Sequence, residues 1–315
     1  MKIRNIILLS LLIVAIGIAI TGYLFNRQPE VNSTSINGEI YNDEQEDVTG
    51  PGSETLSYGL YETDGQILDT LDIGKKTGKK YKKVLSFSHY LSVKRNYSLI
   101  ILSDFKTIPF KADNGQFTKS YSFKMNENTV KKIKLEFEMP PNNNELSFVI
   151  IPEPNFQLNT ENLDVASGLQ ENFTLRYITK NHKNVDNNYF KPQQTTHELS
   201  GEEVFLTSQK TGNKILFKSK NNQKAYLQVF NPQEMPIDYA LVALSGTLQR
   251  KINGESVKFI SVKENTTNIY EINIPQVRDK QNYQIVLFPT PYKTSTIYEG
   301  LNNRSYSTFR TLIEP

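Results

Sequence analysis

Cysteine and tryptophan are absent from this 315-residue chain, and histidine occurs only three times. Without cysteine the chain has no disulfide, no thiolate metal ligand, no cysteine nucleophile and no lipid on a lipobox cysteine. The Cys–Trp–Cys core of antibody domains is excluded as well. His89, His182 and His197 are too scattered in the sequence to predict a zinc site. We therefore expect neither a metal nor another cofactor.

An excess of one charge is also missing. The formal net charge is +3, but Lys2, Arg4 and Arg27 flank an apolar segment, which leaves 33 basic and 33 acidic residues in the rest of the chain. A neutral chain lacks the positive field that attracts nucleic acid. We expect no nucleic-acid partner.

Residues 6–25 form an uncharged apolar run that is long enough to cross a hydrocarbon core of about 30 Å as a helix. The alternative is a cleaved signal peptide, but Tyr23, Leu24 and Phe25 continue the run past the small residues that would form a cleavage site. The basic residues at the start predict a cytoplasmic N-terminus at residues 1–5. The sequence thus predicts a single-pass membrane protein with an uncleaved anchor and its C-terminal part outside the cell.

Residues 26–54 contain few large apolar side chains and are rich in Asn, Ser, Gly and acidic residues. This composition predicts a disordered acidic stalk. An exported chain of this size without cysteine, and rich in Lys and Asn, suits a low-GC Gram-positive bacterium.

An internal repeat is the most informative pattern, because Lys82–Asp104 aligns without gaps with Lys224–Gly246. Further along, Asn114-Gly115 corresponds to Asn253-Gly254, and each pair is a signal for a type I′ hairpin turn. We expect the two copies to turn at equivalent places.

Each copy predicts a sandwich of short strands. Residues alternate between apolar and polar in Leu135–Met139 and again in Tyr270–Ile274, which is typical of a strand with one buried face. The fold class we predict is all-β: two tandem immunoglobulin-like or jelly-roll-like β-sandwiches, at residues 55–180 and 197–315, joined by a linker at 181–196.

One local feature stands out against the neutral background, a cluster of six lysines within nine positions. A solvated hairpin is one interpretation of this cluster. The other is a contact to anionic lipid or to teichoic-acid phosphate, because clustered lysines near a bilayer gain about 1 kcal/mol each from anionic lipid. The candidate contact residues are Lys75, Lys76, Lys79, Lys80, Lys82 and Lys83.

The sequence contains no Gly-rich phosphate loop, nucleophile elbow or EF-hand spacing. Glu136 and Glu271 occupy equivalent positions, but on strand faces that we expect to be wet and in different copies. We therefore predict no catalytic residue and no enzyme activity. The function predicted is a non-catalytic binding or scaffold protein of the cell envelope, acting on an unknown protein or polymer. Two alternatives stay open: an accessory subunit of a membrane complex, and an envelope enzyme with dispersed loop residues.

Overall fold

The computed structural model describes residues 34–36, 39–41, 54–68, 73, 80–157, 163–179, 188–197, 203–293 and 304–315. The chain divides into two compact units, Met1–Asp47 and Val48–Pro315. In the first unit, β1 (Thr34–Ile36) and β2 (Glu39–Tyr41) form an antiparallel pair, within the range where the sequence predicts a stalk. The predicted anchor, residues 6–25, lies outside the described residues. Among the helices in the described ranges, none is long and apolar enough to span a membrane.

The second unit is built from strands packed face to face, so the predicted all-β, sandwich class is confirmed. Its first repeat has two antiparallel sheets, which we call sheets 1 and 2. Sheet 1 contains, in order, β3 (Thr55–Tyr61), β4 (Lys80–Tyr90), β9 (Thr129–Glu138) and β7 (Phe110–Ala112). Sheet 2 contains β11 (Phe173–Ile178), β10 (Glu145–Pro152), β5 (Arg95–Ser103) and β6 (Lys106–Ile108), with β8 (Tyr121–Met125) also paired to β5.

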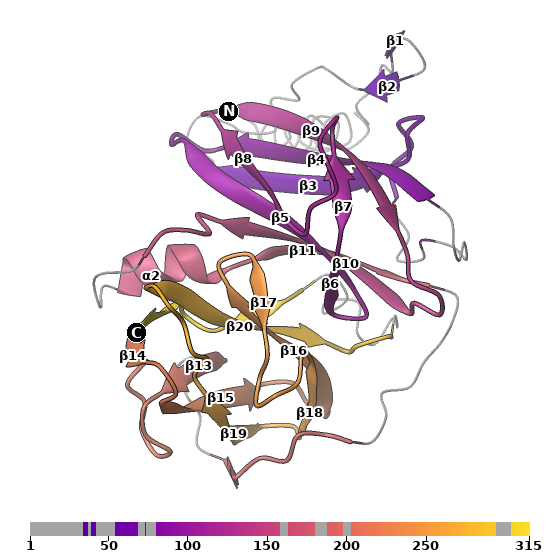
Figure 1. The fold of residues 1–315 in the computed structure, drawn as a ribbon. Helices are drawn as coiled ribbons and strands as arrows, with labels where there is room; N and C mark the ends of the chain where they lie inside the picture. The colour runs from indigo at the N-terminus through magenta and orange to yellow at the C-terminus, as the bar shows by residue number, and fades with distance from the viewer. Residues whose placement is uncertain are drawn as a thin grey trace, which may run out of the picture. The chain divides into compact units, whose positions relative to one another are not determined.

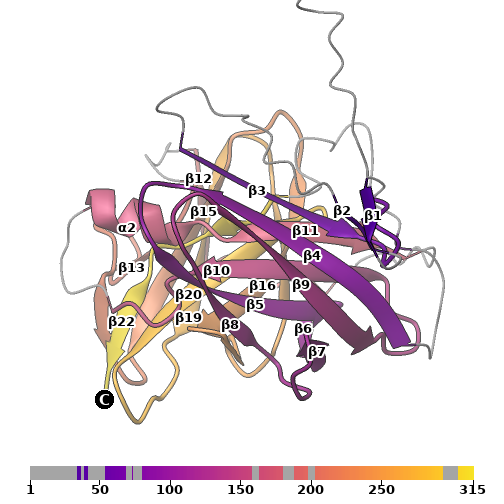
Figure 2. The same cartoon turned by 90° about the horizontal axis from the view of Figure 1, so that it is seen from above.

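The second repeat has two further sheets, which we call sheets 3 and 4. Sheet 3 contains β14 (Lys218–Lys220), β22 (Thr311–Glu314), β20 (Gln281–Pro289), β16 (Ile237–Ser245) and β17 (Leu248–Arg250), with β18 (Lys258–Val262) on β16 and β21 (Tyr306–Ser307) on β20. Sheet 4 contains β12 (Gln194–Thr196), β19 (Thr266–Asn273), β15 (Lys224–Asn231) and β13 (Val204–Thr207). Figures 1 and 2 show these strands from two directions.

Each repeat buries its own core between its two sheets. Alternate residues of β9, such as Ile133, Leu135 and Phe137, are buried in the first core, while the residues between them stay more exposed. The second core has the same construction and includes Tyr270 and Ile272 of β19. The alternation read from the sequence therefore does mark one buried face on these strands.

The repeat extends to strand register. Tyr97 of β5 lies opposite Pro152 of β10, and Tyr239 of β16 lies opposite Pro289 of β20. The equivalence also reaches individual hydrogen bonds. His89 Nε2 donates to the carbonyl of Val93, four residues on, at 2.7 Å. Asn231, the counterpart of His89, donates through Nδ2 to the carbonyl of Met235, also four residues on, at 2.8 Å. Both buried side chains thus hold the loop that follows their strand.

The two Asn-Gly turns differ by one position. Asn253 and Gly254 have φ values of 48° and 90°, and Ile252 pairs with Glu255 across them, as expected for a type I′ turn. In the first copy the positive φ falls on Asp113, at 51°, and Gly115 N donates to the carbonyl of Ala112. That turn is therefore centred on Asp113-Asn114, and Gly115 follows it. Asp113 can occupy this conformation because Asp, like Asn, tolerates the left-handed region.

A third core lies between the two sandwiches. It joins the outer face of sheet 2, through Ile100, Leu102 and Val149, to the outer face of sheet 3, through Val242 and Phe288. The central strands of both sheets are consequently buried on both faces. Each fully buried Val, Leu, Ile or Phe contributes about 1.5–3 kcal/mol relative to an exposed one. The described strands of the second unit therefore pack as four layers, joined across the middle by the third core, rather than as two separate domains.

The helix α2 (Leu163–Gln170) is a departure from the strands and turns expected from the sequence. Its eight residues are too few for a helical period to stand out in the sequence. Ala166 and Leu169 pack against Phe205, Phe217 and Phe309 of the second repeat in a small fourth core. The helix therefore adds a further contact between the two repeats (Figure 1).

Candidate functional site

The predicted lysine cluster is only partly described. Lys75, Lys76 and Lys79 lie outside the described residues. Lys80 and Lys82 on β4 are exposed, and Lys80 lies 3.7 Å from Glu136 across the sheet.

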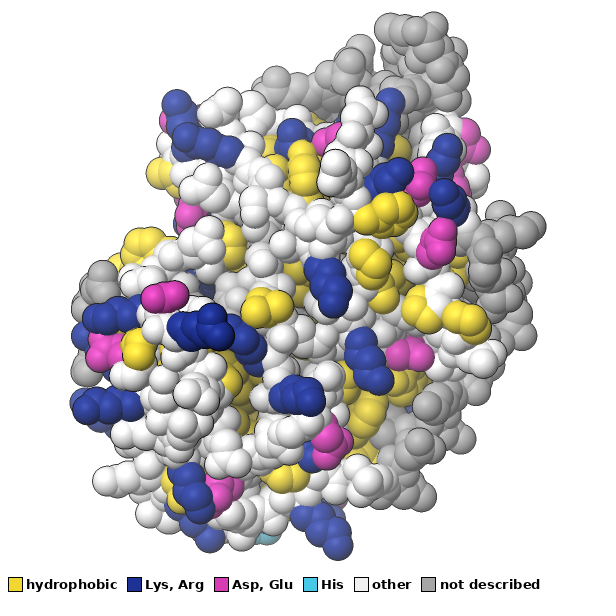
Figure 3. All heavy atoms as spheres, viewed as in Figure 1, with side chains coloured by type: hydrophobic (Ala, Val, Ile, Leu, Met, Phe, Trp, Pro, Cys, Tyr) yellow, Lys and Arg dark blue, Asp and Glu magenta, His cyan; other side chains and the backbone are white. Residues whose placement is uncertain are grey.

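Lys83 differs from its neighbours in the cluster. Its side chain is 6% exposed and forms an ion pair with Glu62. Lys83 is therefore a buried structural residue rather than part of an exposed basic surface. On the face seen in Figure 3, basic side chains are spread over the surface with acidic and hydrophobic ones between them. The anionic contact stays a prediction for the other five lysines.

Exchanging Lys75, Lys76, Lys79, Lys80 and Lys82 for Gln is expected to change the free energy of unfolding by no more than about 0.5 kcal/mol, because exposed charges contribute little. Cosedimentation of the full chain with anionic liposomes should fall several-fold. Adding Lys83→Gln is the matched control for a buried position and should cost a further ~1–3 kcal/mol. If the five-lysine variant cosediments as well as the wild type at low salt, the cluster is a solvated hairpin.

The other candidate groups from the sequence have structural partners. Glu136 contacts Lys80, and Glu271 contacts Lys224 at 2.8 Å, each on a partly exposed sheet face. Hydrogen bonds from Lys224 and Gln193 hold the pKa of Glu271 below its usual range. No group of three or more His, Asp or Glu residues able to hold a metal occurs within the described ranges. The glutamates therefore serve as cross-strand partners.

Charged groups are buried where the two repeats meet, in a region we call the seam. Arg176 Nε donates to Glu145 Oε1 at 2.7 Å, with exposed fractions of 2% and 0%. Arg176 Nη1 also donates to the carbonyl of Pro289 in the second repeat, at 2.6 Å. Glu145 Oε2 accepts from the backbone N–H of Tyr292 at 2.9 Å. One ion pair from the first repeat thus holds backbone groups of the second.

The second repeat also donates hydrogen bonds to the first, through Arg310. Arg310 donates to the carbonyls of Pro152 and Glu153, and Pro152 is the counterpart of Pro289. Arg176 thus donates to Pro289 of the second repeat, and Arg310 donates to the equivalent Pro152 of the first. Such reciprocal contacts are those of a two-fold interface. Burial lowers the pKa of Arg310 to about 10, so it remains a cation at neutral pH.

A cleft of about 640 Å³ lies between residues of the two repeats, and we call it the seam cleft. Its walls come from the end of α2, the starts of β11 and β13, the middle of β3, and β21. Figure 1 shows α2, with β11 and β20 nearby, at the junction of the two sandwiches. The lining residues are Tyr58, Ser167, Gln170, Glu171, Asn172, Thr174, Glu203, Val204, Arg304, Ser305, Tyr306 and Ser307.

Two tyrosines of the seam cleft stay neutral over a wide pH range. Burial, with a smaller effect of Glu171, raises the pKa of Tyr58. Burial and the nearby Glu203 raise the pKa of Tyr306, while Arg304 opposes this effect. Both phenols therefore act as hydrogen-bond donors or acceptors, and no tyrosinate nucleophile forms there at neutral pH.

Asn172 at the wall of the seam cleft has an unused acceptor. Its side chain is 4% exposed, and Nδ2 donates to Gln284 Oε1 at 3.2 Å and to Ser307 Oγ at 2.9 Å. Its Oδ1 is buried without a hydrogen-bond partner. A buried amide oxygen without a donor costs free energy, about 1–3 kcal/mol.

Sequence reasoning did not find the seam cleft. Its residues come from four separate segments between Tyr58 and Ser307, and most of their types, such as serine, glutamine, glutamate and tyrosine, are common on any surface. No spacing in the sequence connects them. The only available signal is the duplication, because a duplicated sandwich offers a junction between its copies.

No family model and no curated protein matches the chain. Among solved structures, the E. coli chaperone DraB is 10% identical, with a TM-score of 0.25 over 83% of this chain and 96% of that one. A chain of the Salmonella enterica SafA pilin complex with the SafB chaperone is 13% identical, with a TM-score of 0.25 over 82% and 98%. Similarity at this level carries no argument about function. The structure itself defines the chain as a double β-sandwich protein with a third core shared between the two sandwiches.

Proposed function

We propose that the chain is a non-catalytic binding or scaffold protein of a bacterial cell envelope. In this proposal, residues 6–25 anchor it in the membrane, and two immunoglobulin-like or jelly-roll-like sandwiches stand outside the cell. The observation that carries the proposal is the third core between sheets 2 and 3, together with the reciprocal contacts of Arg176 and Arg310. A rigid double sandwich presents its surfaces in a fixed geometry, which suits display to a partner.

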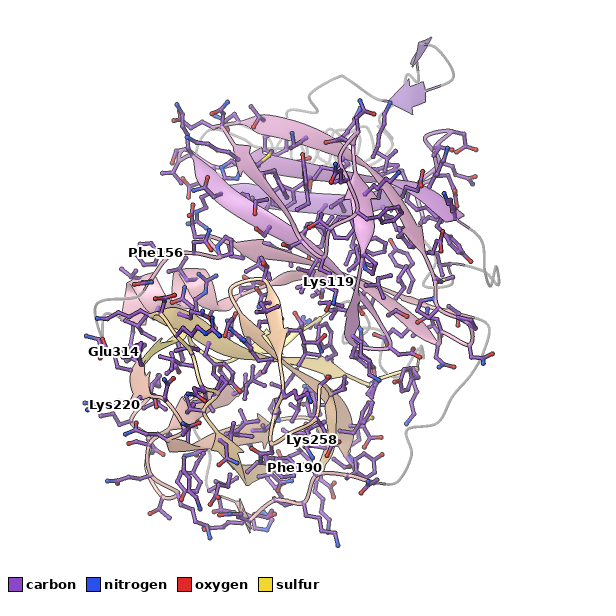
Figure 4. The ribbon with its side chains drawn as sticks, viewed as in Figure 1. Lys119, Phe156, Phe190, Lys220, Lys258 and Glu314 are labelled. Atoms are coloured by element: carbon purple, nitrogen blue, oxygen red, sulfur yellow. The ribbon has the colours of Figure 1, made fainter. Side chains whose placement is uncertain are left out.

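The use of charged side chains supports the same proposal. Glu145 accepts hydrogen bonds from Arg176, Ser147 and the backbone of Tyr292, so its oxygens are committed to the fold. Surface aromatic and basic groups also stabilise the fold: Lys258 lies 5.2 Å from the ring centre of Phe190 (Figure 4). A catalytic carboxylate, by contrast, needs access to a substrate.

Photo-crosslinking in intact cells tests the proposal. A photoreactive residue at Ser167, which is exposed on the rim of the seam cleft, is expected to capture a discrete envelope component. The matched control is the same probe at Glu127, exposed in the β8–β9 turn. Equal labelling from both positions contradicts a specific binding surface.

Protease treatment tests the external placement of the two sandwiches. Protease added to wall-stripped cells should remove a C-terminal tag, and a protected tag contradicts this placement.

A further inference from the structure

The seam cleft has the dimensions of a ligand site. Its volume of about 640 Å³ falls within the range of ~300–1,000 Å³ that is common for small-ligand sites. Both repeats contribute walls: Tyr58, Glu171 and Asn172 from the first, Glu203 and Arg304 from the second. The site therefore exists only in the assembled double sandwich.

The lining places hydrogen-bond acceptors and donors side by side. Glu171 and Glu203 bring carboxylate oxygens to the lining, and Arg304, which donates a hydrogen bond to Tyr306, brings only donors. Tyr58 and Tyr306 stay protonated, so each hydroxyl keeps a proton to donate, while the Tyr58 oxygen accepts from the backbone of Thr174 and the Tyr306 oxygen from Arg304. This mixture matches a ligand whose own groups donate and accept together, which is the property of hydroxyls.

The charge of the lining argues against strongly charged ligands. Two carboxylates oppose a phosphate polymer, which a single arginine does not attract enough to bind. Arg304 opposes the binding of a polycation. It lies close to Glu203, since both residues shift the pKa of Tyr306. A neutral ligand faces neither penalty, and the two phenol rings offer it apolar surface with a polar tip.

Asn172 also lines the seam cleft, and its Nδ2 donates to Gln284 and Ser307. Its Oδ1 has no hydrogen-bond partner but is itself buried, so it offers a ligand no contact in this structure. The exposed charged residues of the lining are Glu171, Glu203 and Arg304.

We propose that the seam cleft binds a short neutral stretch of a polyhydroxylated polymer, that is, a saccharide segment. This inference rests on the proposed binding function and names the chemistry of its partner. The carboxylates and the arginine contact ring hydroxyls, and the tyrosine rings pack against the C–H faces of the sugar. The ligand is held without a change in its covalent bonds.

The test uses the full-length chain on an array of neutral, anionic and cationic oligosaccharides of one to six units. Neutral oligosaccharides are expected to bind, and the double variant Glu171→Ala/Arg304→Ala should bind them at least 10-fold more weakly with an unchanged melting temperature, because both residues are exposed. Glu127→Ala, on an exposed turn away from the seam cleft lining, is the matched control and should bind like the wild type.

The outcomes separate this inference from the proposed function. Binding of neutral oligosaccharides without new reducing ends supports both. Release of reducing ends would show catalysis, which overturns the non-catalytic proposal and leaves the ligand class standing. Binding of charged oligosaccharides only, equal binding by the double variant, or no binding of neutral ones overturns the saccharide inference. In that last case a specific crosslink from Ser167 still supports the binding function.

Discussion

Replacing Arg176 by methionine is expected to lower the free energy of unfolding by about 3–5 kcal/mol, because the substitution leaves the Glu145 carboxylate buried without its cation. The two side chains are 2% and 0% exposed and lie 2.7 Å apart. The remaining partners of the carboxylate are Ser147 Oγ at 3.3 Å and Tyr292 N at 2.9 Å, which are neutral donors. Methionine also gives up the hydrogen bond to Pro289 across the seam. Equilibrium unfolding in urea, followed by circular dichroism, measures the loss.

The double variant Glu145→Gln/Arg176→Met is the matched control. Gln keeps the shape of the glutamate side chain and removes its charge, so no ion is left unpaired. We expect the double variant to recover most of the stability lost in the single variant, since replacing a buried ion pair by neutral groups is often nearly neutral. A loss below about 1 kcal/mol in the Arg176→Met protein would show that the pair is solvated in solution, contrary to its burial.

The Val242→Asp variant is expected to separate the unfolding of the two repeats. Val242 is fully buried in the third core, between sheets 2 and 3, and contributes nothing to the core inside either sandwich. An unpaired carboxylate there costs several kcal/mol and acts mainly on the seam. The wild type should unfold in a single calorimetric transition, and the variant in two, with the first at a markedly lower temperature.

The same change on the surface is the control for this experiment. Val130 of β9 is 44% exposed, so Val130→Asp should alter the free energy of unfolding by no more than about 0.5 kcal/mol and keep the single transition. Two transitions in the wild type would mean that the third core does not couple the repeats. A single transition in Val242→Asp, shifted to lower temperature, would mean that each sandwich depends on the other to fold.

The sequence predicted the strands and their duplication well, because both depend on local patterns. The alternation in β9 marked its buried face, and the ungapped match of Lys82–Asp104 with Lys224–Gly246 placed equivalent strands in equivalent register. The third core was not predicted, although it leaves a signal. Strands buried on both faces read as continuous apolar runs rather than alternating ones. Leu99–Leu102 and Ala240–Leu244 are such runs.

The site could be predicted far less well than the fold. The lysine cluster was read as one exposed group, but Lys83 faces inward to Glu62, a partner 21 residues away that charge density alone does not identify. The seam cleft depends on how one sandwich meets the other. Glu171 and Glu203 become neighbours of one cavity only after both repeats have folded and packed. Long-range packing of this kind has no short sequence pattern.

The reciprocal arginine contacts have the pattern of a symmetric homodimer interface, here formed by two halves of one chain. A covalent link keeps the second half at an effective concentration in the millimolar range, so the halves stay together even when their contact surface weakens. In a homodimer, each mutation also appears at both symmetric positions, whereas in a single chain with two halves it appears in one half only. The halves are then free to diverge at matching positions: Glu145 in the first corresponds to Asn282 in the second. Gene fusion thus allows a two-fold surface to evolve an asymmetric site, with each half supplying different groups.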